Sequence, residues 1–410
     1  MSVISQWKEL DNNQRGALVA SFLGWTLDAF DFFLMVFMLG AIAKEFGTNV
    51  TSVAFALTLT LAARPLGALV FGMLADRYGR RPVLMIDILL FSIIEFASAF
   101  APTLVVLLIL RAAFGFAMGG EWGLGASLTM ETIPAKARGI ASGLLQTGYP
   151  FGYLLASVVY GLLFDSIGWR GMFMVGVLPA LLVLFIRRNV KESPAWHSMR
   201  AAPRQSLGKV LKTRWPLFIY VVVLMTAFNL FSHGTQDLYP TFLQVQHKLS
   251  THTVSIIAIV GNVGAITGGL LFGAFSQRVG RRKAIMFGAL IALPIIPLWA
   301  FSATPVLLGI GAFLMQVAVQ GAWGVIPVHL NELSPDEVRG TFPGFAYQLG
   351  NLLASGNATI QAGLAADHGG NYAFALAAIA TGAAVAIAIL TFFGPEKHGV
   401  EFGVRGAPPS

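Results

Sequence analysis

Long apolar stretches, separated by short polar segments, run along the whole chain. An α-helix rises 1.5 Å per residue, so about 20 apolar residues cross the roughly 30 Å of hydrocarbon in a bilayer. Stretches of this length fall near residues 17–43, 51–75, 83–101, 103–131, 138–164, 170–187, 216–246, 252–276, 284–301, 304–331, 341–366 and 371–394. The pattern predicts an all-α membrane protein with twelve transmembrane helices, which we number as predicted helices 1–12 in this order.

The composition excludes most other classes of protein. Of the 410 residues, 56% are hydrophobic and 11% are charged, whereas about 25% of the residues of a soluble protein are charged. The chain has no cysteine, which excludes disulfides, thiolate nucleophiles and Cys-ligated metals. There is also no paired-histidine motif, so we expect no metal, no cofactor and no enzymatic activity.

The basic residues concentrate on one side of the predicted membrane. The chain has 27 Lys and Arg and a net charge of +8, yet the loops of one side hold only Lys44, Arg170 and Lys248. Basic loops stay in the cytoplasm, so both termini are expected there, in a multi-pass protein of the cytoplasmic (inner) membrane. The excess charge then faces anionic lipid headgroups. We expect no nucleic-acid partner, and a monomer.

The two halves of the chain match each other at one fixed offset of 201 residues. The first matching block pairs Gly72, Arg77, Gly79, Arg80 and Arg81 with Gly273, Arg278, Gly280, Arg281 and Arg282. Two more blocks keep this register, pairing Gly120, Trp122, Gly123, Glu131, Arg138 and Gly139 with Gly321, Trp323, Gly324, Glu332, Arg339 and Gly340. Such duplication is typical of transporters. It predicts one six-helix bundle at residues 1–187 and a second at residues 216–394. A basic linker, residues 188–215, connects them, and a tail, residues 395–410, follows.

The segment from Gly72 through Asp76 to Arg80 resembles the loop 2–3 motif of the major facilitator superfamily, and the resemblance covers the whole chain. It implies two pseudo-symmetric bundles that rock about a central site. We expect Asp76 to cap a helix end or to pair with basic residues. Gln277 takes its place in the second copy, so we expect the contact between the halves to be weaker there. The expected gating residues are Gly72, Asp76, Arg77, Gly79, Arg80, Glu131, Arg138, Glu332 and Arg339.

Four ionisable residues fall near mid-bilayer, where a charge costs several kcal/mol and indicates function. Asp28 and Asp31 share one face of helix 1, while Arg64 and Arg111 reach comparable depth on helices 2 and 4. The second half has neutral residues at the matching positions, Asn229, Ser232, Ala265 and Ala312. A purely structural network would not explain this asymmetry, so we interpret the cluster as a site for proton coupling or anion binding.

Three further carboxyls lie within the predicted helices. Glu121, in a glycine-rich run of helix 4, lies deeper and can pair with helix 1 or 2; it is a further candidate for proton coupling. Asp87 and Glu95 lie on helix 3, which usually stands outside the cavity in the resembled superfamily. We interpret Asp87 as an interfacial pair and place neither residue in the site.

Helix 7 carries an unusual run of polar residues. Its pattern resembles the signature of the sialate:proton symporter family, Asn-x-x-Ser/Thr-His-x-Ser/Thr-Gln-Asp-x-x-x-Thr, at Asn229, Ser232, His233, Thr235, Gln236, Asp237 and Thr241. The resemblance implies that Asn229, His233, Gln236 and Asp237 bind substrate or move protons. Independently, the spacing of Asn229, His233 and Gln236 places them on one helical face.

Helix 11 and helix 2 add residues that this family resemblance singles out. Fungal lactate and pyruvate permeases belong to the family, and their helix 11 glutamine and asparagine resemble Gln348 and Asn351 here. The family also has an arginine on helix 2, which Arg64 resembles. Arg111 is the competing partner for an anion.

We therefore expect a proton-coupled symporter of a small monocarboxylate such as lactate, pyruvate or acetate. Arg64 or Arg111 would hold the carboxylate. Asn229, His233, Gln348 and Asn351, on helices 7 and 11, would form hydrogen bonds to the remaining oxygens of the substrate. Asp28, Asp31 or Asp237 would carry the proton.

Three alternatives stay open. Sialic acid is one, although its permeases in this family carry two extra central spans and segment 188–215 is too basic to cross a membrane. Aromatic acids are another, since the paired aspartates of helix 1 also resemble aromatic-acid symporters. A receptor that senses a carboxylate without moving it is the most distant, because it would need an output domain.

Overall fold

The computed structural model describes residues 9–200 and 207–402, and this part of the chain is helical with no β-strand. The helices of the first half are α2 (Asn12–Glu45), α3 (Val50–Tyr78), α4 (Arg80–Ser98), α5 (Leu104–Met118), α6 (Glu121–Thr132), α7 (Arg138–Gln146), α8 (Gly148–Val175) and α9 (Ala180–Asn189). Two short helices follow, α10 (Pro194–Arg200) and α11 (Leu207–Thr213).

The second half repeats this order. Its helices are α12 (Trp215–Gln236), α13 (Tyr239–Val245), α14 (Thr251–Val279), α15 (Arg281–Ala300), α16 (Pro305–Gly324), α17 (Ile326–Leu333), α18 (Phe342–Ala354), α19 (Asn357–Asp367) and α20 (Tyr372–Phe393). Single 3₁₀ turns, Ala135–Ala137 and Asp336–Val338, precede α7 and α18.

The prediction of an all-helical membrane protein is confirmed. Nine helical stretches of the described residues are long and apolar enough to cross a membrane, and each of the twelve predicted spans corresponds to one helix or to consecutive helices. Predicted spans five and six meet inside α8, where Gly168 has a φ of +61°. This left-handed conformation, which glycine tolerates, turns the chain between the two spans.

The internal repeat extends to the residues that begin the helices. Asn49 and Ser250, 201 residues apart, cap α3 and α14 by accepting from the backbone N–H three residues on. Thr103 and Thr304 cap α5 and α16 in the same way. The two halves therefore share local structure as well as sequence.

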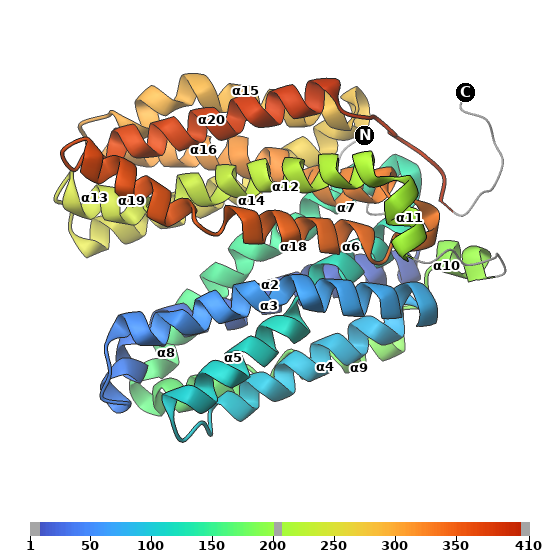
Figure 1. The fold of residues 1–410 in the computed structure, drawn as a ribbon, viewed down its shortest axis with the longest axis horizontal. Helices are drawn as coiled ribbons and strands as arrows, with labels where there is room; N and C mark the ends of the chain where they lie inside the picture. Colours follow the sequence, from blue (N-terminus) through green and yellow to red (C-terminus); the bar gives the residue numbers. More distant parts are fainter. Residues whose placement is uncertain (1–8, 201–206, 403–410) are drawn as a thin grey trace.

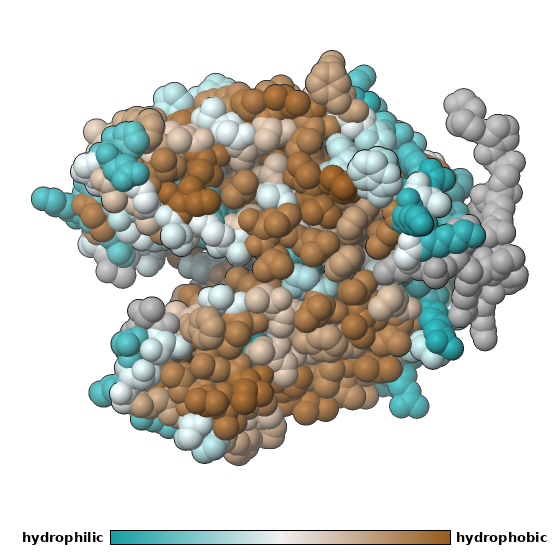
Figure 2. Space-filling model, in the orientation of Figure 1, coloured by the Kyte–Doolittle hydropathy of each residue, from teal (hydrophilic) through white to brown (hydrophobic). Residues whose placement is uncertain are grey.

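The two halves form separate helical groups that meet toward one end (Figure 1). Helices α10 and α11 lie at this end, which we call the linker end. There α3 packs against α18, and α7 packs against α14. At the opposite end the space-filling view shows an open cleft between the halves (Figure 2). The protein is therefore closed at the linker end and open at the other.

Apolar side chains cover much of the flank of both halves (Figure 2). Leu66, Leu162 and Phe393 are 62%, 73% and 81% exposed. Exposed apolar surface of this extent marks contact with lipid rather than water.

Glycines allow the halves to approach closely at the linker end. A Cβ on Gly72 of α3 would lie 2.6 Å from the Cα of Thr341, and one on Gly143 of α7 would lie 2.3 Å from the carbonyl oxygen of Gly269 on α14. Any larger residue would force these crossings apart.

The segment after α20 contacts both halves of the protein. Gly399 N–H donates to Glu332 in the second half (3.2 Å), and the carbonyl of Val400 accepts from Arg138 in the first half. The ring of Phe402 lies under two guanidiniums, 3.7 Å from that of Arg138 and 4.0 Å from that of Arg339. This segment therefore joins the two halves at the linker end.

Replacing Phe402 should loosen this junction. Phe402→Ala removes two cation–π contacts worth together about 1–2 kcal/mol, so the junction should open roughly 5–30 times more often. Hydrogen exchange at the starts of α7 and α18 should become faster. Phe393→Ala, which removes an exposed ring at the end of α20, is the matched control, and equal exchange in the two variants would show that the Phe402 contacts contribute nothing.

Candidate functional site

A pocket lies between the two halves and is lined by both. The first half contributes Trp25, Ala29, Phe32, Leu61, Arg64, Gln146 and Tyr149, and the second contributes Asn229, Ser232, His233, Gln236, Gln320, Trp323, Tyr347 and Asn351. The first half thus supplies the arginine and three rings, and the second half supplies four amides beside a histidine, a serine and two rings.

An ion pair crosses the first-half wall of the pocket. Nη2 of Arg64 lies 3.1 Å from Oδ2 of Asp28, and the two residues are 6% and 0% exposed. Arg64 is the one Lys or Arg among the lining residues. Pro65 follows it inside α3 and leaves the carbonyl of Leu61, which also lines the pocket, without its helical donor. Helices α2 and α3 therefore present one cation and its counter-ion to the pocket.

Helix α12 supplies the polar side chains of the opposite wall. Asn229, Ser232, His233 and Gln236 all line the pocket. Nδ1 of His233 lies 3.2 Å from Oδ1 of Asp237, which is not among the lining residues. The structure thus brings together four polar residues of α12, which is the predicted helix 7, and Asp237 lies next to the histidine.

Two glutamines of α16 support this wall, Gln320 as a lining residue and Gln316 as a partner of Gln236, and the sequence analysis missed both. Gln236 donates to Oε1 of Gln316 (2.9 Å), and Gln320 donates to Oγ of Ser232 (3.2 Å). They lie four residues apart on a span that is otherwise apolar. That spacing, which puts two amides on one helical face, was the available signal.

The two candidates on α18, which is the predicted helix 11, differ in whether they reach the pocket. Asn351 and its neighbour Tyr347 line the pocket, whereas Gln348 is 1% exposed and is not among the lining residues. All three lie on α18, so the difference comes from the direction in which each side chain leaves the helix.

The expectation that Arg111 competes for the anion does not agree with its position. Its guanidinium lies 2.7 Å from Glu95 and donates to Ser98 (2.6 Å), both on α4, and covers the ring of Phe114. These partners hold it away from the pocket. Asp31 lies on the same side, since its carboxyl and the side chain of Glu95 both approach Gly176.

The deeper carboxyls also lie outside the pocket lining. Glu121 and Asp87 are both 0% exposed, and neither carboxyl has a hydrogen-bond partner among the described residues. The interpretation of Asp87 as an interfacial pair is therefore wrong.

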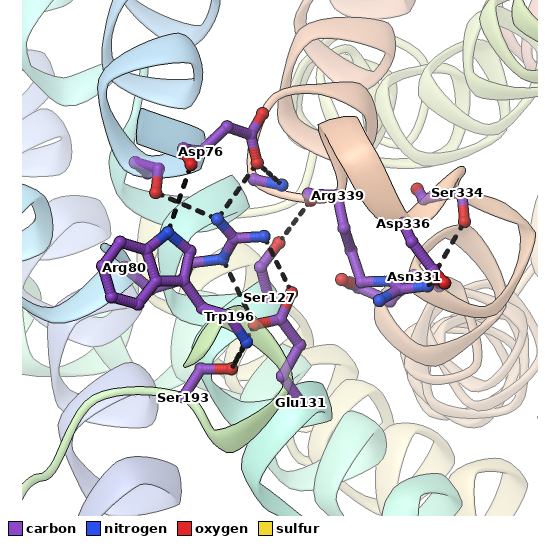
Figure 3. A network of polar contacts seen from close by, with 12 residues as sticks. Asp76, Arg80, Ser127, Glu131, Ser193, Trp196, Asn331, Ser334, Asp336 and Arg339 are labelled. Atoms are coloured by element: carbon purple, nitrogen blue, oxygen red, sulfur yellow. Dashed lines mark hydrogen bonds and ion pairs between the residues drawn. The ribbon is translucent and has the colours of Figure 1, made fainter. Parts of the chain in front are cut away.

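The carboxylate of Asp76 joins the two halves at the linker end (Figure 3). It accepts from the backbone N–H of Gly340 (2.8 Å) and from the N–H and hydroxyl of Thr341 (3.1 and 2.6 Å), just before α18. Arg80 lies 3.1 Å from Asp76 and 2.9 Å from Glu131. We call these five residues the clasp, since they tie α3 to the start of α18.

In the second copy of this arrangement a neutral amide, Gln277, stands in the place of Asp76. Gln277 accepts from the N–H of Gly139 (3.0 Å) and donates to the carbonyl of Ala135 (3.0 Å), while Arg281 pairs with Glu332 (2.9 Å). Hydrogen bonds to a charged acceptor are stronger than those to a neutral amide. The crossing of α7 and α14 therefore depends more on close packing than the clasp does.

The other expected gating residues hold the ends of helices. Arg138 donates to the carbonyl of Met130 near the end of α6 (2.9 Å), and Arg339 donates to that of Asn331 near the end of α17 (3.2 Å). Gly79 has a φ of +113° and turns the chain from α3 into α4. Arg77 lies over the ring of Tyr78.

Two loop carboxylates were missed by the sequence analysis. Glu192 accepts from the N–H groups of Arg80 and Arg81 at the start of α4 (3.0 and 3.1 Å). Glu396 accepts in the same way from Arg281 and Arg282 at the start of α15 (3.2 and 2.9 Å). Negative charge at a helix N-terminus is stabilising. The two glutamates lie 204 residues apart, outside the 201-residue register that revealed the other pairs.

Several curated proteins resemble this chain over most of its length. The carboxylic acid transporter protein homolog of Saccharomyces cerevisiae is 30% identical over 84% of this chain, which spans 60% of that relative's length. The sialic acid transporter NanX of Escherichia coli is 29% identical, with 84% of this chain and 85% of NanX covered. A probable 4-methylmuconolactone transporter of Cupriavidus pinatubonensis is 31% identical, with 84% and 82% covered.

Solved structures share the fold. The proton:xylose symporter XylE superposes with a TM-score of 0.79 at 20% identity, covering 95% of this chain and 98% of XylE. The human organic anion transporter MFSD10 superposes with a TM-score of 0.68 at 16% identity, covering 92% of this chain and 99% of that one.

The family match agrees with the architecture. A model described as Major Facilitator Superfamily matches residues 21–251 and 237–408. The chain is accordingly an integral, multi-pass membrane protein, and a secondary transporter rather than an enzyme. It belongs to the Major Facilitator Superfamily, as the loop 2–3 motif and the internal repeat predicted.

Proposed function

We propose that this chain is a proton-coupled symporter of a small monocarboxylate such as lactate, pyruvate or acetate. The observation that carries the proposal is the ion pair of Arg64 with Asp28 at the pocket wall. A transporter of carboxylates needs a cation that the anion can reach, and Arg64 is the cation of this pocket. The relatives named for carboxylic acid and sialic acid support an acidic substrate.

The pair also supplies a reason for coupling. Arg64 donates through Nη2 to Asp28, and its Nε has no acceptor among the described residues. When the carboxylate of the substrate binds the guanidinium of Arg64, the buried Asp28 is left without a counter-ion. An unpaired buried carboxylate costs several kcal/mol, so Asp28 takes up a proton. Anion and proton therefore bind together.

The charge count of the pocket favours one carboxylate per substrate. One cation can compensate one carboxylate, and a second would remain unpaired in a poorly hydrated site. The amides of Gln236, Gln320 and Asn351 can donate to a keto or hydroxyl oxygen of the same molecule. A short 2-keto or 2-hydroxy acid therefore matches the lining groups.

Transport requires the linker end to open and the opposite end to close. We propose that the halves, 1–187 and 216–394, rock about the pocket, with 188–215 and 395–410 as linker and tail. The basic loops support a cytoplasmic linker end, which makes the present state outward-open. The clasp has to break in every cycle, and α3 and α18 then separate.

A second candidate substrate is an aromatic or conjugated acid. Five of the lining residues are aromatic, namely Trp25, Phe32, Tyr149, Trp323 and Tyr347. The rings of Trp25 and Tyr149 are stacked with centroids 5.7 Å apart, and an aromatic ligand could extend this stack. Relatives named for 4-methylmuconolactone and cis,cis-muconate support this class.

Uptake by purified protein in liposomes tests the proposal. With the lumen more alkaline than the medium, lactate, pyruvate or acetate should accumulate above its equilibrium level, and collapse of the pH gradient should abolish accumulation. Benzoate and sialate in parallel assays test the alternatives. Accumulation that does not respond to the pH gradient would contradict proton coupling, whichever substrate is carried.

The two arginines should separate by affinity. Arg64→Gln should weaken substrate binding by about 1.5–3 kcal/mol, or roughly 10–150-fold, because a charge-assisted hydrogen bond is lost. Arg111→Gln combined with Glu95→Gln is the matched control, since it removes a buried pair without leaving an unpaired charge. Its affinity should stay within about twofold of wild type. Binding to purified protein measures both, and equal losses would mean that Arg64 has no special role.

Asp28→Asn should uncouple transport from the proton. The amide keeps a hydrogen-bond acceptor for Arg64 but neither takes up nor releases a proton. Accumulation driven by a pH gradient should disappear, while exchange of labelled for unlabelled substrate should continue. Asp367→Asn, at an exposed residue at the end of α19, serves as control. Accumulation by the Asp28 variant at the wild-type level would remove this residue from the coupling step.

His233 should make substrate affinity depend on pH. Histidine changes its charge near neutral pH, and His233 lines the pocket with Asp237 behind it. When protonated it adds a second positive charge facing the anion. His233→Gln keeps hydrogen-bonding capacity, so affinity at about pH 5.5 and about pH 7.5 should differ less than in wild type. Equal weakening at both pH values would instead mean that the ring acts as a neutral hydrogen-bonding group.

A further inference from the structure

The buried carboxyls of the first half include three that lie on three different helices. Asp28 of α2, Glu121 of α6 and Asp87 of α4 are each 0% exposed. Asp28 has Arg64 as its partner, whereas both oxygens of Glu121 and of Asp87 have no hydrogen-bond partner among the described residues. The transport scheme above uses only Asp28.

Their positions connect them in order. Oε1 of Glu121 lies 2.2 Å from where a Cβ on Gly24 would be, and Gly24 precedes Asp28 by one helical turn. Oδ1 of Asp87 lies 2.8 Å from where a Cβ on Gly120 would be, next to Glu121 in the chain. The absence of side chains on both glycines leaves room for the carboxyls.

The three groups descend from the pocket toward the linker end. Both α2 and α4 begin there, at Asn12 and Arg80. At 1.5 Å per residue, Asp28 lies ~24 Å and Gly24 ~18 Å from the start of α2, and Asp87 lies ~10 Å from the start of α4. Glu121, level with Gly24, therefore stands between the other two carboxyls.

The charged groups around them do not provide counter-ions. Asp28, Asp87 and Arg64 interact electrostatically with Glu121, and Asp28 interacts with Asp87. Arg64 is already bonded to Asp28. Two other buried cations of the first half, Arg80 and Arg111, are paired with Glu131 and Glu95. Since unpaired buried carboxylates are costly, a proton on each of Glu121 and Asp87 is the state that the site favours.

We propose that Glu121 and Asp87 form a proton relay from Asp28 toward the linker end. The proposal rests on the proposed proton symport and extends it with an exit route. The relay makes Asp87, which the sequence placed outside the site, a functional residue. It leads to the end that the clasp closes in the present state, so release requires the clasp to open.

The steps balance as a chain of proton transfers. When the substrate leaves Arg64, the proton of Asp28 is no longer needed there. Asp87 loses its proton to water at the opened linker end, and its new carboxylate takes the proton of Glu121. Glu121 then takes the proton of Asp28, whose carboxylate returns to Arg64. One proton has left the protein, and both relay groups are protonated again.

Isosteric amides test the relay. Asp87→Asn and Glu121→Gln resemble the protonated acids but transfer no proton. In liposomes, accumulation driven by a pH gradient should fall roughly tenfold or more in each variant, and substrate-driven proton movement, followed with an internal pH dye, should fall with it. Exchange of labelled for unlabelled substrate, which needs no net proton release, should stay within about twofold of wild type.

Each other outcome has a defined meaning. If accumulation and exchange both survive in the amide variants, the carboxyls are passive and the relay is wrong, while the proposed symport stands. If exchange and substrate binding are both lost, the two residues are structural, which also overturns the relay. Asp87→Glu, which keeps a carboxyl, should restore accumulation if the relay holds. If wild type itself shows no pH-driven accumulation, the proposed function fails and the relay fails with it.

Discussion

The structure depends on one constraint, the cost of a charge that is buried without a partner. In the first half three pairs meet this cost, namely Arg64 with Asp28 at the pocket, Arg111 with Glu95 behind it, and Arg80 with Glu131 at the linker end. Glu121 and Asp87 have no such partner among the described residues. Only the Arg64 pair borders the pocket. Of these three pairs it is therefore the one that a ligand can reach and break, and the proposed coupling follows because breaking it leaves a buried charge that a proton can neutralise.

The duplicated halves have diverged in complementary ways. The first half keeps charges where the second has neutral residues, and the second half has amides on α16 where the first has glycines. Gln316 and Gln320 correspond to Gly115 and Gly119, glycines that pack against the backbone of α3 near Thr60 and Arg64. One half thus uses this face to pack closely against α3, whereas in the other half Gln320 lines the pocket and Gln316 bonds to Gln236.

Much of the fold could be predicted from the sequence, since apolar length, loop charge and the 201-residue register each report on it directly. The Asp28–Arg64 neighbourhood also followed from depth along the helices. Depth does not give the direction in which a side chain points, so Arg111 could not be separated from Arg64, nor Gln348 from Asn351. Glu192 and Glu396 escaped because they lie in loops outside the register, and the partnerless state of Asp87 is a property of packing alone.

The central claim is that substrate and proton bind as a pair at Arg64 and Asp28. Proton uptake on substrate binding tests it most directly, measured with purified protein in weakly buffered detergent solution and a pH indicator. The account predicts that adding a monocarboxylate at neutral pH makes the solution more alkaline by about one proton per anion bound, in line with protonation of one carboxyl. Saturable binding of the anion with no uptake of protons would contradict it.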